Sequence, residues 1–348
     1  MFSRGMFKYI ILLCCFIIML LLTKVIENRF EIEHFKEDEQ PRPSEKLRNV
    51  GRFTSEGKHV KNKARRSHDV NAVLHFPLRK RANKKLTKTK EDVPTIYAIT
   101  PTYKRFLQKA ELTRICNTFL HVKNFHWILV EDSRNKTKLV TSFLSNCGVK
   151  YTHLNVRTPK PLRRSRKQPR WAKSRGVEQR NLGIEWIRQN VNPNKTKGVI
   201  YFADDDNTYD LKLFDEMRSI KGVGIWPVAF TGAARWSGPI CRDGKVLKFH
   251  NNWKPWRKFP IDMAGFAINI RKLIMEYPHA SFQPQVRPGL METSFLEQMT
   301  TLDELEPRGD NCMKVYVWHT RTETPVININ GERQLIKKGH PSNPAIET

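Results

Sequence analysis

Short apolar runs, of which the second and third end in carboxylates, constrain this chain more than any other feature. They lie at residues 95–100, 126–132 and 198–206. Stretches with apolar residues at helical spacing, around 110–120 and 177–189, separate them. Strands without a polar face are typical of a parallel sheet that helices cover on both sides, and ligands bind beyond the carboxyl ends of such strands. We therefore predict an α/β fold whose site contains Asp132 and the aspartates 204–206.

The rest of the chain is long enough to complete one such fold. Its 348 residues, 39% of them hydrophobic, are enough to bury a large core. After the third strand, the pattern predicts a strand within 262–270, a helix from Glu292 to Met299 and a strand over 313–318.

The N-terminal segment 9–22 carries no charge and is about 21 Å long as a helix. Extended from Phe7 to Ile26, the apolar region approaches the roughly 30 Å of a bilayer core, and we place the anchor at 9–26. Arg4 and Lys8 precede it, which favours a cytosolic tail over 1–8 and a lumenal remainder. A cleaved signal peptide is the alternative, but no small-x-small cleavage site follows. We predict a single-pass type II signal anchor, and its short span suits the Golgi membrane.

The segment 27–92 is rich in charge and poor in apolar clusters, so we expect a flexible stem. Its basic runs are either solvated or hold the protein near anionic glycans or lipid head groups. The whole chain has 62 Lys and Arg against 34 Asp and Glu, a net charge of +28, which favours polyanionic partners. Nucleic acid is the least expected of these, because the anchor predicts a lumenal domain and no nucleic-acid-binding motif accompanies the charge.

Two Asn-Lys-Thr sequons, at Asn135 and Asn194, predict N-glycosylation and agree with a lumenal location. Four cysteines follow the anchor: Cys116, Cys147, Cys241 and Cys312. They lack the Cys-x-x-Cys spacing of a zinc site and form zero, one or two disulfides, whose pairing the sequence leaves open.

Three successive aspartates, Asp204, Asp205 and Asp206, follow the third strand directly. Such carboxylates repel one another unless positive charge compensates them, and a divalent cation that also holds a diphosphate does so. The triplet therefore favours Mg²⁺ or Mn²⁺. The alternative is a cluster of acids that caps a helix over 211–217.

Two pairs of basic residues suit a phosphate-bearing ligand. Arg175 and Arg180 are five residues apart where a loop enters a helix, so both can reach a phosphate or an aspartate of the triplet. His319 and Arg321 alternate along an extended segment and share a face, where they can stabilise a departing diphosphate. Each pair also has a structural alternative: a solvated helix start for the first and a fold-stabilising contact for the second.

Taken together, these segments resemble the Golgi β-1,3-glucuronyltransferases, the galactosylgalactosylxylosylprotein 3-beta-glucuronosyltransferase family. The matching stretches, in order, are 101–105, 131–133, 175–181, 202–209, 261–267, 305–308 with 311–312, 317–323 and 343–347. They cover nearly all of the chain beyond the stem. The resemblance implies a GT-A type, Rossmann-like nucleotide-sugar transferase fold, in which 93–210 binds the UDP-sugar donor and 211–348 binds the acceptor and holds the catalytic base.

The resemblance also implies roles for single residues. On the donor side, Tyr103 stacks on uracil, Asp132 accepts from its imide, Arg175 and Arg180 serve the nucleotide, Asp204 braces Arg180, Asp205 meets the ribose, Asp206 ligates Mn²⁺, and His319 and Arg321 hold the diphosphate. On the acceptor side, Trp253, Arg257 and Asp262 contact galactose, and Glu292 is the general base.

The implied reaction is an inverting transfer of glucuronate from UDP-glucuronate to a terminal galactose of the proteoglycan linkage region. One carboxylate takes the proton of the acceptor hydroxyl, while metal and cations at the diphosphate replace a general acid. Glu292 opens a helix, whose N-terminal dipole is expected to lower its proton affinity and keep it ionised. The alternative for Glu292 is a favourable first-turn residue without a chemical role.

One position departs from the family pattern. Ser237 follows Arg235 and Trp236, where family members commonly carry a glutamate that touches the acceptor galactose. The same transfer onto N-acetyllactosamine ends of glycoproteins or glycolipids is therefore a second hypothesis. A catalytically silent glycan-binding protein that uses the stem and the basic insert 160–171 is a third. The resemblance also implies a homodimer.

Overall fold

The structure, a computed structural model, describes residues 93–346 apart from 166, 170–171, 324–325, 327 and 343–345. The predicted cytosolic tail 1–8, signal anchor 9–26 and stem 27–92 lie outside the described residues. Within the described ranges, no helix has the length and apolar character needed to span a bilayer.

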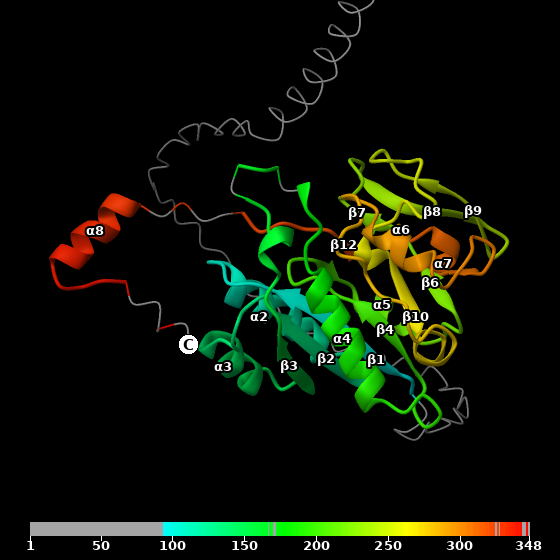
Figure 1. The fold of residues 1–348 in the computed structure, drawn as a ribbon, viewed down its shortest axis with the longest axis horizontal. Coiled ribbons are helices and arrows are strands. Elements are labelled where there is room, and N and C mark those ends of the chain that lie inside the picture. The colour runs from blue at the N-terminus through cyan, green and yellow to red at the C-terminus, as the bar shows by residue number, and fades with distance from the viewer. Residues whose placement is uncertain are drawn as a thin grey trace, which may run out of the picture. The chain divides into compact units, whose positions relative to one another are not determined.

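A seven-stranded sheet in the order β11-β6-β10-β4-β1-β2-β3 underlies the fold (Figure 1). Its strands are β1 (Thr95–Thr102), β2 (Phe125–Glu131), β3 (Tyr151–Asn155), β4 (Gly198–Phe202), β6 (Val223–Ile225), β10 (Phe266–Asn269) and β11 (Leu305–Pro307). Four of the pairings are parallel, β1 with β2 and β4, β2 with β3, and β6 with β11, so the predicted mostly parallel sheet is confirmed. β10 runs antiparallel to β4 and β6. An apolar run buried on both faces is compatible with either direction, so the sequence did not reveal this reversal.

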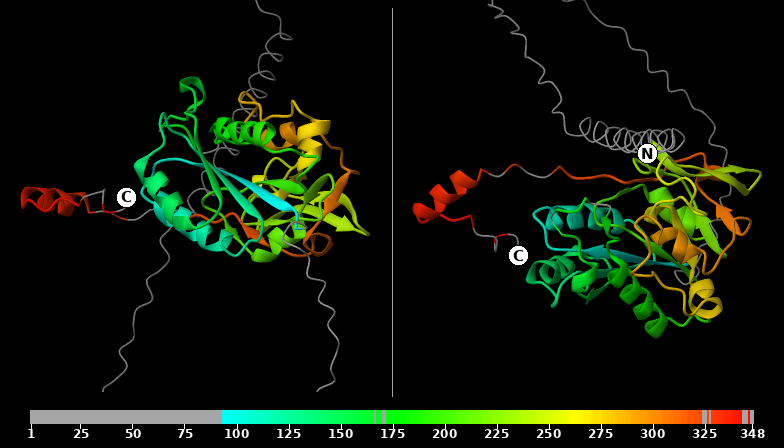
Figure 2. Two further views of the ribbon diagram at one scale, coloured as in Figure 1. Left: turned by 90° about the horizontal axis from the view of Figure 1, so that it is seen from below. Right: turned by 45° about the horizontal axis from the view of Figure 1, so that its top comes forward.

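The central strands are apolar because helices cover both faces of the sheet (Figure 2). The helices concerned are α2 (Gln108–Phe119), α3 (Lys138–Cys147), α4 (Val177–Asn190), α5 (Leu211–Met217) and α6 (Met291–Leu296). Ile96 and Ala98 of β1 join one core with α2, α3 and α5. Tyr97 and Ile99 join the other core with α4 and α6. Alternate residues of one strand are thus buried on opposite faces, as the missing polar face predicted.

A second, five-stranded sheet was not predicted, and it carries the loops around 230–235 and 250–262. Its order is β5-β12-β7-β8-β9, with β5 at Thr208–Tyr209, β7 at Val228–Ala229, β8 at Trp236–Arg242, β9 at Lys245–His250 and β12 at Val317–Trp318. The remaining helical segments are Lys160–Leu162, Met263–Gly265, Lys272–Glu276, α7 (Gly309–Cys312) and α8 (Ile329–Lys337).

The strand predicted over 313–318 is wrong except at its end, where Val317–Trp318 forms β12. The preceding residues Gly309–Cys312 have φ between 54° and 67°, in the left-handed region. Lys314 N donates to Gly309 O at 2.9 Å, which closes a turn. The chain therefore becomes extended only at Val317.

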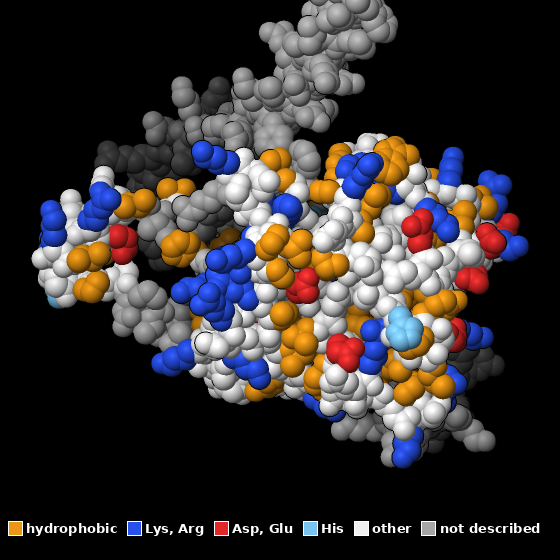
Figure 3. All heavy atoms as spheres, in the orientation of Figure 1, with side chains coloured by type: hydrophobic (Ala, Val, Ile, Leu, Met, Phe, Trp, Pro, Cys, Tyr) orange, Lys and Arg blue, Asp and Glu red, His pale blue; other side chains and the backbone are white. Residues whose placement is uncertain are grey.

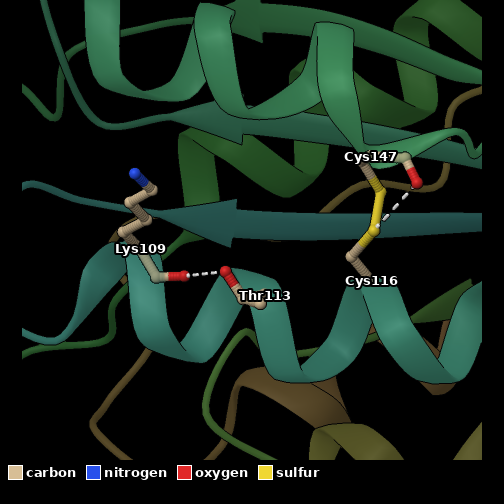
Figure 4. The surroundings of a disulfide bond; sticks show 4 residues. All are labelled: Lys109, Thr113, Cys116 and Cys147. Carbon is tan, nitrogen blue, oxygen red and sulfur yellow. Dashed lines mark hydrogen bonds between the residues drawn. A yellow bond between two sulfur atoms is a disulfide. The ribbon is translucent and has the colours of Figure 1, made fainter. Parts of the chain in front are cut away.

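Two disulfides supply the pairing that the sequence left open. Cys116 of α2 is bonded to Cys147 at the end of α3 (Figure 4). Cys241 of β8 is bonded to Cys312 of α7, 71 residues further along the chain. The first ties two helices that cover the same face of the large sheet, and the second ties the small sheet to the left-handed turn.

Replacing Cys241 and Cys312 together by serine is expected to lower the free energy of unfolding by about 4 kcal/mol, because the disulfide closes a long loop in the unfolded chain. For a domain of this size, that loss lowers Tm by about 10 °C. Circular dichroism during heating measures the shift, with the wild-type chain melted in parallel. An unchanged Tm would mean that the disulfide does not restrict the unfolded ensemble.

Candidate active site

The predicted carboxylates lie beyond the carboxyl ends of parallel strands, as the sequence indicated. Asp132 follows β2, and its main-chain N–H donates to Thr102 O at the end of β1, at 2.8 Å. The Asp204–Asp206 turn follows β4, the other neighbour of β1. Tyr103 follows β1 itself. These residues therefore share the sheet edge at which α/β folds bind ligands.

The three aspartates of the turn have different partners. Asp204 Oδ1 accepts a hydrogen bond from Arg180 Nη2, the bracing contact that the resemblance implied. Asp205 is 7% exposed, and its Oδ2 lies 2.7 Å from Arg105 Nη2. The main-chain oxygen of Asp206 accepts two hydrogen bonds, whereas its carboxylate has no hydrogen-bond partner among the described residues. Two members of the triplet are thus neutralised by arginine and one is left available.

The electrostatics of the turn suit a hard divalent cation at Asp206. Burial, and then the charge of Asp204, raise the pKa of Asp206. Burial also raises the pKa of Asp205 to about 6, although Arg105 opposes this. No group of three or more potential His, Cys, Asp and Glu ligands gathers in the described part of the chain. One available carboxylate fits Mg²⁺ or Mn²⁺, ions that take several ligands from phosphate and water.

Arg105 is a site residue to which the sequence analysis gave no role. Its Nε donates to Glu111 Oε2 at 2.8 Å, and its guanidinium lies 4.7 Å from the ring centroid of Tyr103. It therefore links two buried carboxylates, Glu111 and Asp205, to the predicted uracil platform. Its position in the stretch 101–105 was the only available signal, because the need for a cation arises from the burial of acids that are distant in sequence.

The residues predicted to bind the nucleotide make a second contact that the sequence analysis did not predict. Both oxygens of Asp132 accept hydrogen bonds from Thr158, Oδ1 from the main-chain N–H at 2.8 Å and Oδ2 from the hydroxyl at 2.6 Å. These bonds fix the orientation of the carboxylate. Tyr103 is 48% exposed, as a stacking platform must be. Arg175 is exposed, and its carbonyl accepts from Arg180 Nη1 at 2.9 Å.

His319 joins the predicted donor residues to the predicted acceptor residues. Its Nδ1 lies 3.5 Å from Asp262 Oδ2, and its main-chain N–H donates to Ala229 O at 2.9 Å. Asp262 also accepts from Thr231 Oγ1 at 3.1 Å. Arg321, two residues after His319, is exposed. The sequence placed His319 and Arg321 on one face, but the contact between His319 and Asp262 depends on tertiary structure.

Glu292 lies among the predicted acceptor residues. Its Oε2 is 3.9 Å from Arg257 Nη1, and the guanidinium of Arg257 lies 5.3 Å from the ring centroid of Trp253. Arg257 is held in place by Gly289 O, which accepts from Nη1 at 2.8 Å. Gly289 has φ +85°, and a Cβ there would lie 2.1 Å from the Trp253 ring, so only glycine fits. Thr293 Oγ1 donates to Phe259 O at 2.8 Å and anchors α6 beside this group.

The direction expected for the pKa shift of Glu292 was wrong. Burial is the main reason that the pKa of Glu292 rises to about 7, and the negative charge of Asp262 adds to it. Arg257 lowers this pKa by less. A shift of this size corresponds to about 3 kcal/mol, whereas a helix dipole contributes about 0.3–1 kcal/mol to a first-turn carboxylate. Burial therefore outweighs the dipole, and Glu292 has the proton affinity of a general base near neutral pH.

The positions outside this group differ in exposure. Ser237, on β8 opposite Val228, is 1% exposed, and its hydroxyl has no hydrogen-bond partner among the described residues. The sequon residues Asn135 and Asn194 are exposed. A surface cavity of about 490 Å³, lined by 303–308 and two further residues, contains none of the predicted site residues.

Comparisons with known proteins show which family the chain belongs to. The profile of glycosyltransferase family 43 matches residues 115–323. Human galactosylgalactosylxylosylprotein 3-beta-glucuronosyltransferase 3 is 46% identical over 266 residues, 74% of this chain and 78% of that protein. The corresponding proteins 2 and 1 of Rattus norvegicus are 50% identical over 242 residues (69% and 72% of the two chains) and 48% identical over 262 residues (74% and 76%).

Likeness to solved structures is much lower. A crystal structure of S. aureus TarS 1–349 in complex with UDP is 12% identical, with a TM-score of 0.39, over 66% of this chain and 61% of that one. A likeness at that level carries no weight for fold or function. The profile match and the identity to three relatives, each covered over more than two thirds of its length, do carry weight, and the chain therefore belongs to glycosyltransferase family 43.

Proposed function

We propose that this chain is an inverting β-1,3-glucuronosyltransferase that moves glucuronate from UDP-glucuronate to a terminal galactose. The observation that carries the proposal is the placement of Glu292, with its pKa near 7, beside Asp262, which in turn contacts His319 of the donor side. Asp262 thus lies between Glu292, the base for an acceptor hydroxyl, and His319, the imidazole expected to meet the leaving diphosphate. The names of the relatives support the substrate pair.

The chemistry follows from these positions. Glu292 takes the proton of the acceptor hydroxyl as its oxygen forms a bond to the anomeric carbon, and the bond from that carbon to the diphosphate oxygen breaks. UDP leaves with the electron pair, and the anomeric configuration inverts. Arg257 and Asp262 orient the acceptor, while His319 and Arg321 balance the charge that develops on the diphosphate.

Asp206 is the residue that would hold Mn²⁺. Its carboxylate is the one in the triplet that no described arginine contacts. A bound divalent cation supplies charge stabilisation to the departing diphosphate. Asp204 acts indirectly, because Arg180 holds it in the turn. Asp205, which Arg105 contacts, is the residue expected to meet the ribose.

A Golgi location, a type II anchor, N-glycosylation at Asn135 and Asn194, a GT-A type fold and a homodimer belong to the same proposal. Two disulfides support an oxidising lumen, because such bonds are rare in the cytosol. Lys and Arg side chains form a dense group on the face drawn in Figure 3, which suits an anionic donor and an anionic glycan.

Ser237 supports a second acceptor, an N-acetyllactosamine end. Its buried hydroxyl has no partner among the described residues and carries no charge, so the acceptor region lacks a carboxylate that the family commonly has. The first proposal, the galactosyl-galactosyl-xylose linker, rests on the names of the relatives.

The test is an acceptor screen with the purified full-length chain, UDP-glucuronate and Mn²⁺. Galactosyl-galactosyl-xylose and N-acetyllactosamine are compared at equal concentration, and UDP release is measured with and without each acceptor. We expect UDP release only when an acceptor is present. UDP release at the same rate with and without either acceptor, or no UDP release at all, would contradict the proposed transfer.

The rate is expected to depend on the protonation of Glu292. A proton bound below its pKa removes the base, so kcat/KM rises about tenfold per pH unit below about pH 7 and levels off above it. Asp262→Asn removes a negative charge that raises this pKa, so the ascending limb moves to lower pH, whatever the height of the plateau. Initial rates across a pH series measure both limbs, and a limb that moves to higher pH in this variant would contradict the assignment.

A further inference from the structure

The main-chain oxygen of Asp206 accepts two hydrogen bonds from segments that are far apart in the sequence. Arg114 Nη2 of α2 donates to it at 2.6 Å. Thr320 Oγ1, just after His319, donates to it at 2.6 Å as well. The acidic turn is therefore fixed from two sides at its third residue, the residue whose carboxylate is available.

Arg114 also reaches the segment that contains Arg321. Its Nη1 donates to Thr322 Oγ1 at 3.3 Å. Thr320 and Thr322 flank Arg321, and both are tied to one oxygen atom, Thr320 directly and Thr322 through Arg114. A single guanidinium thus joins the acidic turn to the basic segment 319–322.

We propose that Arg114 is a positioning residue that sets Asp206 and Arg321 at the spacing a nucleoside diphosphate requires. The proposal rests on the proposed function, in which both residues serve the same diphosphate. A guanidinium is suited to this task because its planar fork donates to two acceptors in a fixed geometry.

The contacts of Arg114 are not needed to hold α2 in the fold. Leu112, Ile115 and Phe119 are 0–1% exposed in the core, and Cys116 is bonded to Cys147. The Arg114 side chain is half-buried and points its donors at the site rather than at the core. The helix therefore serves as a fixed support from which Arg114 contacts both the acidic turn and the segment around Arg321.

Arg114→Ala in the full-length chain is expected to raise the KM for UDP-glucuronate and the Kd for UDP by about tenfold, the loss of a charged hydrogen bond. The KM for the galactose acceptor stays within about twofold, because Arg257 and Asp262 are untouched. Arg114→Lys keeps the charge but offers one head group to two acceptors, so its effect is intermediate. Calorimetric titration with UDP and Mn²⁺ measures Kd, and initial rates measure the two KM values.

Two further variants separate positioning from folding. Arg218 makes contacts of the same kind away from the site, donating to the carbonyls of Pro94 and Lys123, so Arg218→Ala is a matched control. It is expected to lower Tm and leave the UDP Kd unchanged. Thr322→Val removes one acceptor of Arg114, and adding it to Arg114→Ala is expected to cause no further loss, because both act through one contact.

A UDP Kd that stays at the wild-type value in Arg114→Ala, with a Tm lowered as in Arg218→Ala, would overturn the proposal. A wild-type chain that binds UDP but transfers no glucuronate would instead contradict the proposed function. The ratio of UDP Kd values still decides the role of Arg114 in that case.

Discussion

Glu292→Gln is expected to lower kcat about a thousandfold, because an amide cannot take the proton of the acceptor hydroxyl. The KM values for donor and acceptor change little, since glutamine keeps the size of the side chain and its place beside Arg257. Initial rates with saturating UDP-glucuronate and acceptor measure the loss. The effect is larger than that of any acceptor-binding variant because it removes a step of the chemistry rather than a contact.

The melting temperature, measured at acidic and alkaline pH, provides a control for Glu292→Gln. An ionised Glu292 is unfavourable where it is buried, so its raised pKa means that the native state loses stability as pH rises through about 7. Glutamine does not ionise, so the variant does not lose this stability. It is expected to have a higher Tm than the wild type at alkaline pH and the same Tm at acidic pH. Glu297→Gln, at the exposed end of α6, is the matched variant and should keep full activity. Undiminished kcat in Glu292→Gln would remove the proposed base.

Asp206→Asn is expected to lower transfer by at least about a hundredfold and to abolish the response of the rate to added Mn²⁺. Asparagine keeps the main-chain oxygen that Arg114 and Thr320 bind, so the turn is retained while the charge of the available carboxylate is lost. Rates at a series of Mn²⁺ concentrations, together with UDP titrations, measure the effect.

Asp210→Asn is the matched control for Asp206→Asn. Asp210 lies four residues further along and caps α5, with Oδ1 accepting from Lys212 N at 2.8 Å. Asparagine is an equally good cap, so stability and activity are expected to stay near wild type. If Asp206→Asn and Asp210→Asn transfer glucuronate equally well, Asp206 does not serve the diphosphate.

Local sequence pattern predicted the elements that this site stands on. The apolar runs of β1, β2 and β4 and the apolar spacing of α2 and α4 are properties of neighbouring residues, so they were visible without coordinates. Strand direction was not visible for β10, because burial on both faces produces the same apolar run in either direction. The strand predicted over 313–318 was wrong over most of its length for a related reason. Apolar alternation does not reveal that the preceding residues 309–312 form a left-handed turn.

Local sequence pattern could not predict the contacts that organise the site, because they join residues far apart in the sequence. Arg105 meets Asp205, and Arg114 meets both Asp206 and Thr322, across about 100 to 200 residues of sequence. Thr158 orients Asp132 from the far side of a helix and a strand. Nothing in the local composition around these residues distinguishes them from other surface arginines and threonines.

By itself, the sequence determined which residue types stand at the ends of the strands, because the strand pattern and the acids are adjacent in the chain. Only the tertiary structure decided which partners, exposure and pKa each carboxylate has. Packing supplies Asp204 and Asp205 with arginines, leaves Asp206 available, and buries Glu292 beside Asp262 so that its pKa rises to about 7. The physical reason is that proton affinity depends on the solvent and charges around a group, and in this fold those surroundings come from segments far apart in sequence.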